Sequence, residues 1–207
     1  MSRNSWRARF FGGFTLLLLA VVIGTACSKP SDPKTQVAKM LAAHNRHDVT
    51  GQLAFFAEDA SIVVGGQTPV TGKVAIRNLY AADSVMNSEL MYADLVVHGD
   101  TVLVNSVVER NDLLRLLGVP EVRYLPGTRV VFTKGLVQRI ETSRLDQRDW
   151  RAMRDGFMAL MNWLQTAHPE LQREVASGRL SGNNATAARG WLEVAAEWRE
   201  SEAARGN

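Results

Sequence analysis

Cysteine is almost absent from this sequence, which contains a single one, Cys27, in 207 residues. No disulfide can form within one chain, so the fold has to be held together by its hydrophobic core. The sequence also contains no paired-cysteine motif, no glycine-rich phosphate loop and no Gly-x-Ser-x-Gly nucleophile elbow. No short motif therefore assigns a chemistry directly.

A hydrophobic run long enough to span a membrane comfortably is also lacking. The apolar segment from Phe10 to Ile23 is interrupted by Gly12 and Gly13, and a transmembrane helix needs about 20 apolar residues. Three arginines precede this segment, and small residues follow it. A basic start, a short apolar core and small residues before a break are typical of a secretory signal. We therefore predict a signal peptide over residues 1–26 and an exported protein.

Once this signal is removed, the remaining chain has no excess of positive or negative charge. The whole sequence has 24 basic and 21 acidic residues. Three of the basic residues, Arg3, Arg7 and Arg9, and none of the acidic ones precede Cys27, so the remainder has 24 − 3 = 21 basic against 21 acidic residues. The high isoelectric point therefore gives no support for nucleic-acid binding, and we expect no nucleic-acid partner.

The segment Gly24-Thr25-Ala26-Cys27 resembles the end of a bacterial lipoprotein signal, with Gly24 where leucine is usual. The resemblance implies diacylglycerol and acyl chains such as palmitate on Cys27, which becomes the first residue after cleavage. It implies a membrane partner and a location in the bacterial cell envelope, on the periplasmic or surface side. Ordinary signal cleavage beside an unrelated cysteine is the alternative.

The rest of the chain divides into a tether over residues 27–35, a mixed domain over 36–146 and a helical extension over 147–207. In the domain we predict a helix along the apolar stripe Val37 to His44, a short helix at 53–56, a brief strand at 61–64 and a helix over Lys73–Val85. Four strands follow, at Glu89–His98, Thr101–Asn111, Val122–Lys134 and Leu136–Leu145, with a short helix or lid at Leu113–Gly118. In the extension, the apolar face Trp150–Leu164 is expected to pack outside the domain or across its mouth, with Trp191 and Trp198 against it or on a partner.

Three motifs carry a resemblance to a known family: Phe55-Phe56-Ala57-Glu58-Asp59-Ala60-Ser61-Ile62, Thr71-Gly72-Lys73-x-x-Ile76-Arg77 and Phe132-x-x-Gly135-x-Val137. In this order they resemble nuclear transport factor 2-like (NTF2-like) domains, including the SnoaL-like branch, over about residues 36–146. The resemblance implies an α+β fold, in which a cone-shaped, curved antiparallel sheet and N-terminal helices enclose a mostly apolar cavity. Such a cavity suits a small apolar or amphipathic ligand.

The resemblance also identifies where catalytic residues of the ketosteroid-isomerase branch would stand. The general base falls on Val64 and the oxyanion donor on Met40, neither of which can do that chemistry. By the alternation of side chains along a strand, Asn105, Val107 and Glu109 are expected to share one face of their strand, and Arg139, Glu141 and Ser143 one face of the last strand. If these faces point into the cone, the remaining candidates are Glu109 or Glu141 as a base, with Arg139 stabilising developing charge. The alternative, which the cost of burying charge favours, is that these side chains face solvent while Val108 and Ile140 pack inward.

No metal or other cofactor is expected, since His44 and His47 lack further ligands at a diagnostic spacing. Two functions therefore remain open. The first is a non-catalytic lipoprotein whose cone binds a small apolar ligand or docks a partner protein or a second copy of itself. The second is a SnoaL-like lyase or isomerase acting on a small carbonyl compound. The loss of both isomerase positions favours the first.

Overall fold

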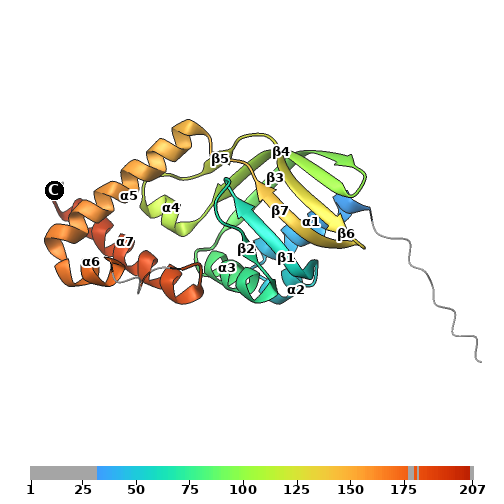
Figure 1. The fold of residues 1–207 in the computed structure, drawn as a ribbon. Coiled ribbons are helices and arrows are strands. Elements are labelled where there is room, and N and C mark those ends of the chain that lie inside the picture. The colour runs from blue at the N-terminus through green and yellow to red at the C-terminus, as the bar shows by residue number, and fades with distance from the viewer. Residues whose placement is uncertain (1–31, 177–179, 181, 206–207) are drawn as a thin grey trace, which may run out of the picture.

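The structure is a computed structural model that describes residues 32–176, 180 and 182–205 (Figure 1). The predicted signal peptide and Cys27 lie outside the described residues, so their roles stay predictions. Within the described residues, no helix combines the length and the apolar character needed to cross a bilayer.

Three helices precede or interrupt the start of the sheet. Helix α1 (Pro33–Asn45) begins inside the predicted tether, because Asp32 caps it by accepting a hydrogen bond from Thr35 N at 3.1 Å and Pro33 suits its first turn. Asp48 caps the short helix α2 (Val49–Leu53), which comes earlier than the helix predicted at 53–56. Helix α3 (Lys73–Val85) has the predicted bounds.

The sheet has seven strands in the described part of the chain: β1 (Phe56–Val64), β2 (Val70–Thr71), β3 (Glu89–His98), β4 (Thr101–Arg110), β5 (Val122–Tyr124), β6 (Thr128–Thr133) and β7 (Leu136–Thr142). Their order is β2-β1-β7-β6-β4-β3, and β5 pairs with β4. All neighbours are antiparallel except β1 and β7, which are parallel. The expected α+β class with a curved sheet and N-terminal helices is confirmed, with this one parallel pair as a difference.

The predicted strand Val122–Lys134 is divided in two. Pro126 and Gly127, whose φ is 103°, form a bend that a continuous strand does not accommodate. As a result β5 pairs with the end of β4, at Val107 to Glu109, and β6 pairs with its beginning, at Thr101 to Val104. The bend places Tyr124 at the end of the sheet where β1 and β7 finish.

The main hydrophobic core lies between the three helices and the inner face of the sheet. Fully or almost fully buried side chains of α1, α3 and the strands compose it, among them Val37, Ile76, Phe56, Val104 and Val130. Full burial of one such aliphatic or aromatic side chain stabilises the fold by about 1.5–3 kcal/mol. The core therefore fixes the sheet against α1 and α3 without a disulfide.

The C-terminal extension forms a second core with the insert between β4 and β5. Its helices are α5 (Gln147–Ala167), α6 (Pro169–Ala176) and α7 (Ala185–Arg205), and the insert contains α4 (Asp112–Leu116). The cluster buries Leu117 beside α4 together with Leu160, Trp163, Val194 and Trp198. A β-carbon on Gly156 would lie 2.4 Å from Leu117 O, so the absence of a side chain there allows α5 to approach this insert.

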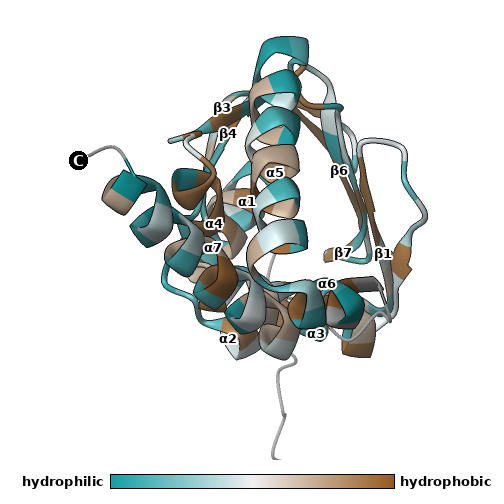
Figure 2. Cartoon of the chain, turned by 90° about the vertical axis from the view of Figure 1, so that its left-hand side faces the viewer, coloured by the Kyte–Doolittle hydropathy of each residue, from teal (hydrophilic) through white to brown (hydrophobic). Residues whose placement is uncertain are grey.

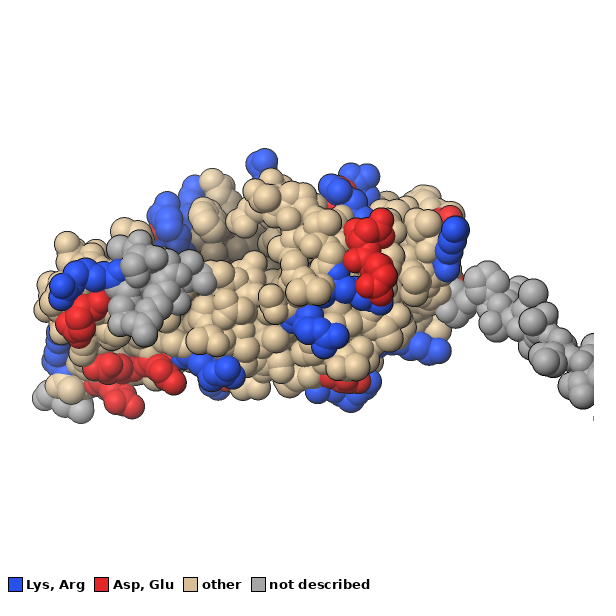
Figure 3. Space-filling model, turned by 60° about the horizontal axis from the view of Figure 1, so that its bottom comes forward, with Lys and Arg blue, Asp and Glu red and all other residues tan. Residues whose placement is uncertain are grey.

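The extension is therefore docked on the domain, as its tryptophan-rich faces predict. Helix α7 also contacts α3, and Trp191 packs against Phe157 with a ring separation of 5.4 Å. Figure 2 shows α5 running across the open end of the curved sheet. On the face in Figure 3, basic and acidic side chains are interspersed, and no field of one sign covers it.

Candidate functional site

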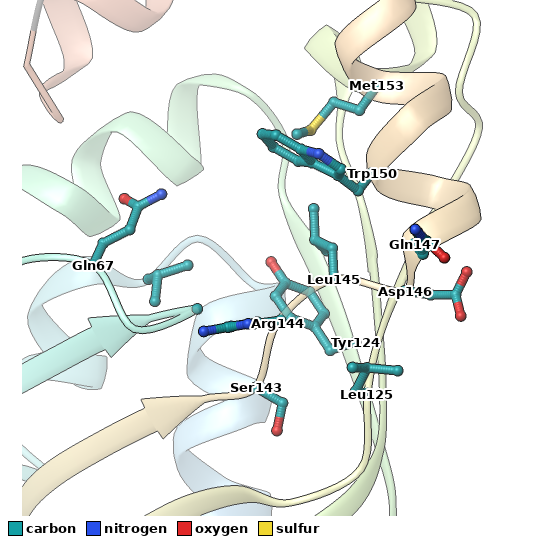
Figure 4. A pocket seen from close by; sticks show the side chains of 12 residues that line it. Gln67, Tyr124, Leu125, Ser143, Arg144, Leu145, Asp146, Gln147, Trp150 and Met153 are labelled. Atoms are coloured by element: carbon teal, nitrogen blue, oxygen red, sulfur yellow. The ribbon is translucent and has the colours of Figure 1, made fainter.

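A pocket of about 830 Å³ lies where the sheet, the segment after β7 and the start of α5 meet (Figure 4). Apolar and aromatic side chains supply much of its wall: Val64, Tyr124, Leu125, Leu145, Trp150 and Met153. The polar part of the lining comprises Gln67, Ser143, Arg144, Asp146 and Gln147. This is the composition of a small-molecule site, in which apolar walls carry a few placed polar groups.

Backbone hydrogen bonds hold the segments that form this pocket. Leu125 N donates to Arg144 O at 2.8 Å, and Asp146 N donates to Arg123 O at 2.8 Å. Gly65 N donates to Thr142 O at 3.1 Å, which ties the end of β1 to the end of β7. Asp146 then caps α5 by accepting a hydrogen bond from Arg148 N at 2.8 Å. The walls are therefore fixed by the fold.

Glu109 on β4 does not line the pocket but is hydrogen-bonded to one of its lining residues. Tyr124, which lines the pocket, donates its hydroxyl proton to Glu109 Oε2 at 2.6 Å. Asn111 Nδ2 donates to Glu109 Oε1 at 2.9 Å, and Ser88 Oγ donates to the same oxygen at 3.4 Å. Three side-chain donors therefore surround this one carboxyl group.

A change of face within β4 explains why Glu109 points inward. Val102 and Val104 are buried, Asn105 is exposed, and the next buried side chain is Val107. The alternation of side chains therefore slips by one between Val104 and Val107. The expectation that Asn105, Val107 and Glu109 share a face holds for the last two residues and is wrong for Asn105.

A second carboxyl group, that of the partly buried Asp83 near the end of α3, lies close enough to Glu109 to interact with its charge. Burial raises the pKa of Asp83 from 3.8 to about 8, and the charge of Glu109 adds to the rise. Burial, and then the carboxyl groups of Glu109 and Asp83, raises the pKa of Tyr92 to about 12. Burial and the neighbouring Glu109 likewise raise the pKa of Tyr124. At neutral pH the cluster therefore holds a protonated Asp83 beside the hydrogen-bonded Glu109.

Sequence reasoning missed Asp83 and Tyr92. The signal for Asp83 was its spacing, because Ile76, Tyr80 and Asp83 recur at the interval of one helix face, and both Ile76 and Tyr80 are buried. An acid on the apolar face of a helix is unusual and points to a functional site.

The structure does not bring Glu141 and Arg139 to this cluster. Arg139 Nε donates to Glu141 Oε1 at 2.7 Å, and Arg129 Nη2 lies 3.1 Å from Glu141 Oε2. These side chains form a partly exposed ladder across β6 and β7, while the neighbouring Ile140 is buried in the core. The two predicted carboxyl groups thus have separate surroundings, and of the two only Glu109 is bonded to a residue that lines the pocket.

The structure also shows where the two positions lie that correspond to catalytic residues of the ketosteroid-isomerase branch. Val64 lies at the pocket, with 37% of its surface exposed, and Met40 is buried in the core. His44 Nδ1 lies 3.2 Å from the side-chain Nε2 of Gln52. Burial lowers the pKa of the His44 ring to about 4. Among the described residues, no three His, Cys, Asp or Glu side chains gather as metal ligands would.

Comparison with known proteins identifies a fold. No family model matches the sequence, and no curated protein matches it either. The epoxide hydrolase/cyclase-like enzyme SalBIII, described for its role in pyran ring formation in the polyether salinomycin, superposes with a TM-score of 0.50 at 18% identity, over 56% of this chain and 92% of that one. An NTF2-like protein of unknown function from Cytophaga hutchinsonii gives 0.48 at 10% identity, over 60% and 98%. An NTF2-like protein from Burkholderia xenovorans gives 0.47 at 23% identity, over 60% and 98%. The superposition on SalBIII, together with the three helices packed on the curved sheet, supports the NTF2-like α+β fold.

Proposed function

We propose that this protein is an exported lipoprotein of the bacterial cell envelope that binds a small apolar or amphipathic ligand between its sheet and α5. The observation that carries the proposal is the pocket of about 830 Å³ with its largely apolar wall. Ligand pockets of about 300–1,000 Å³ enclose most of the surface of a small organic molecule. Trp150 and Met153 of α5 supply one wall, which gives the extension a part in binding.

The anchor is the second part of the proposal. The short segment Ser28–Asp32 separates Cys27 from the first helix, so lipid on Cys27 keeps the domain close to a membrane. Figure 1 places the start of α1 at the end of the molecule opposite to α5. The pocket then lies on the side remote from the anchor and receives its ligand from the aqueous compartment.

Substitution of Cys27 tests the anchor. A Cys27→Ser chain retains the export signal but lacks the thiol that takes the lipid, so it is expected in the soluble exported fraction. The wild-type chain is expected to stay with membranes after a carbonate wash. If the variant also stays with the washed membranes, lipid on Cys27 is not the main attachment.

A pair of matched substitutions tests the pocket. Val64→Trp fills the pocket from its rim, and Val97→Trp places the same bulk on the outer part of β3; the two valines are 37% and 39% exposed. Small molecules are extracted from each natively purified chain and identified by mass spectrometry. A compound retained by the wild type and Val97→Trp but lost in Val64→Trp supports the proposal. Equal retention by both variants contradicts it.

A lyase or isomerase is the second candidate, and the pair Asp83 and Glu109 favours it. Asp83, whose pKa is raised, is a candidate acid beside Glu109 as a candidate base, and Tyr124 connects Glu109 to the pocket. A small enone such as cyclohexenone, incubated with the protein in D₂O, reports proton abstraction as deuterium incorporation by NMR. This candidate requires that the protein incorporate deuterium faster than buffer alone does. Glu109→Gln should abolish this increase, and Glu141→Gln should leave it unchanged.

A further inference from the structure

Among the described residues, Arg144 differs from the arginines of β5, β6 and β7 in having no side-chain partner. Arg123 lies 3.6 Å from Asp149, and Arg129 and Arg139 both contact Glu141. Among the described residues, no carboxylate or carbonyl oxygen accepts a hydrogen bond from the guanidinium of Arg144. Its side chain is exposed and lines the pocket.

The position of Arg144 is set by its backbone. Its carbonyl accepts the hydrogen bond from Leu125 N, and its Cα lies 3.9 Å from where a β-carbon on Gly65 would stand. Figure 4 shows the side chain reaching toward Gln67, on the far side of the pocket from Asp146. The guanidinium is therefore presented to the pocket by a segment held on both sides.

Among the described residues that line the pocket, Arg144 is the only basic one, and the only acidic one, Asp146, is engaged elsewhere. Asp146 caps α5 through Arg148 N and points away from Arg144 (Figure 4). The remaining lining side chains are uncharged. A ligand in this pocket thus meets one unpaired positive charge beside an apolar wall.

We infer that the pocket takes an anionic amphiphile, whose carboxylate or phosphate head pairs with Arg144 while its apolar chain lies against Leu145, Trp150 and Met153. A guanidinium presents a planar fork of donors that matches both kinds of head group. The inference rests on the proposed function and names the ligand class for the same site.

The test uses the chain Ser28–Asn207, which contains every described residue, and four twelve-carbon probes kept below their micellar concentrations. Dodecanoate and dodecyl phosphate carry the two anionic heads, dodecanol is neutral, and dodecyltrimethylammonium is cationic. Binding is measured by calorimetry. At least one of the two anions is expected to bind about tenfold more tightly than dodecanol, because dodecanol cannot make the charge-assisted contact with Arg144. The tighter of the two anions identifies the head group as carboxylate or phosphate.

Arg144→Gln should bring the affinity for the anion down to that for dodecanol and leave dodecanol binding unchanged, which also shows that the variant is folded. Arg148→Gln removes a neighbouring charge on α5 that does not line the pocket, and is expected to have no effect. Equal binding of anions and dodecanol, or an equal loss in both variants, overturns the inference but leaves the pocket as a binding site. Binding of none of the four probes contradicts the proposed function and the inference with it.

Discussion

Replacing Asp83 by Asn is expected to stabilise the protein, and to do so increasingly as the pH rises. The folded chain retains the proton of Asp83 up to about pH 8, whereas an ordinary Asp releases it near 3.8. Between these values the unfolded state binds fewer protons than the folded state, so the free energy of unfolding falls as the pH rises. Asn does not titrate and is close in shape to the protonated acid, so the variant lacks this fall.

The magnitude follows from the two pKa values. The difference between 3.8 and about 8 corresponds to roughly 6 kcal/mol at about 1.4 kcal/mol per pH unit. Water and neighbouring side chains relax around a newly charged group, which reduces the penalty in real proteins to several kcal/mol or less. We therefore expect Asp83→Asn to gain about 1–3 kcal/mol more at pH 8 than at pH 5.

Urea unfolding followed by tryptophan fluorescence at pH 5, 6.5 and 8 measures this gain. Asp100→Asn, at the exposed turn between β3 and β4, is the control and should show no pH-dependent gain. Glu109→Gln should reduce the effect, because the charge of Glu109 is the second cause of the raised pKa of Asp83. A gain for Asp83→Asn that is the same at all three pH values would refute the reasoning.

Three further predictions concern stability. Burial depresses the pKa of His44 from 6.5 to about 4, so between these values the folded state binds fewer protons than the unfolded state and loses stability as the pH falls. His44→Gln should therefore reduce the dependence of the free energy of unfolding on pH between 6.5 and 4, measured in urea. An unchanged dependence would contradict this. Asp149→Ala removes the acceptor of Arg123 N at 2.8 Å and should cost about 1–3 kcal/mol in urea unfolding, whereas Asp155→Ala, at an exposed ion pair, should cost little. A chain that ends after Asp146 uncovers Leu117 and α3 and should melt lower or aggregate; an unchanged midpoint in a soluble monomer would mean that the extension is an independent arm.

Much of the fold was predictable from local patterns. Helix α3 and strand β3 have the bounds that their periodicity predicts, because a 3.6-residue stripe and a tight Gly99-Asp100 turn are local signals. The division of Val122–Lys134 was not predicted, although Pro126 and Gly127 lie within it, because its flanks alternate like one strand. The parallel pairing of β1 with β7 depends on contacts between segments far apart in the chain, which no local pattern records.

The site was less predictable, because it depends on which face each strand turns inward. Glu109 was named as a candidate, yet its inward direction results from the slip in β4, and the partners Tyr124 and Asp83 come from a different strand and helix. Glu141 and Arg139 matched the same pattern of alternation but pair with each other outside the pocket. Alternation grouped the side chains of one strand correctly only where that strand was regular.

The most direct test of ligand binding observes the pocket wall itself. Methyl groups of methionine are labelled with ¹³C in the chain Ser28–Asn207, and their NMR signals are followed while dodecanoate is added. Met153 lines the pocket, and Met158, further along the same helix, is 51% exposed and does not. Binding at this pocket is expected to shift the signal of Met153 to saturation while that of Met158 stays in place. A Met153 signal that does not move, or equal shifts of both signals, would contradict binding between the sheet and α5.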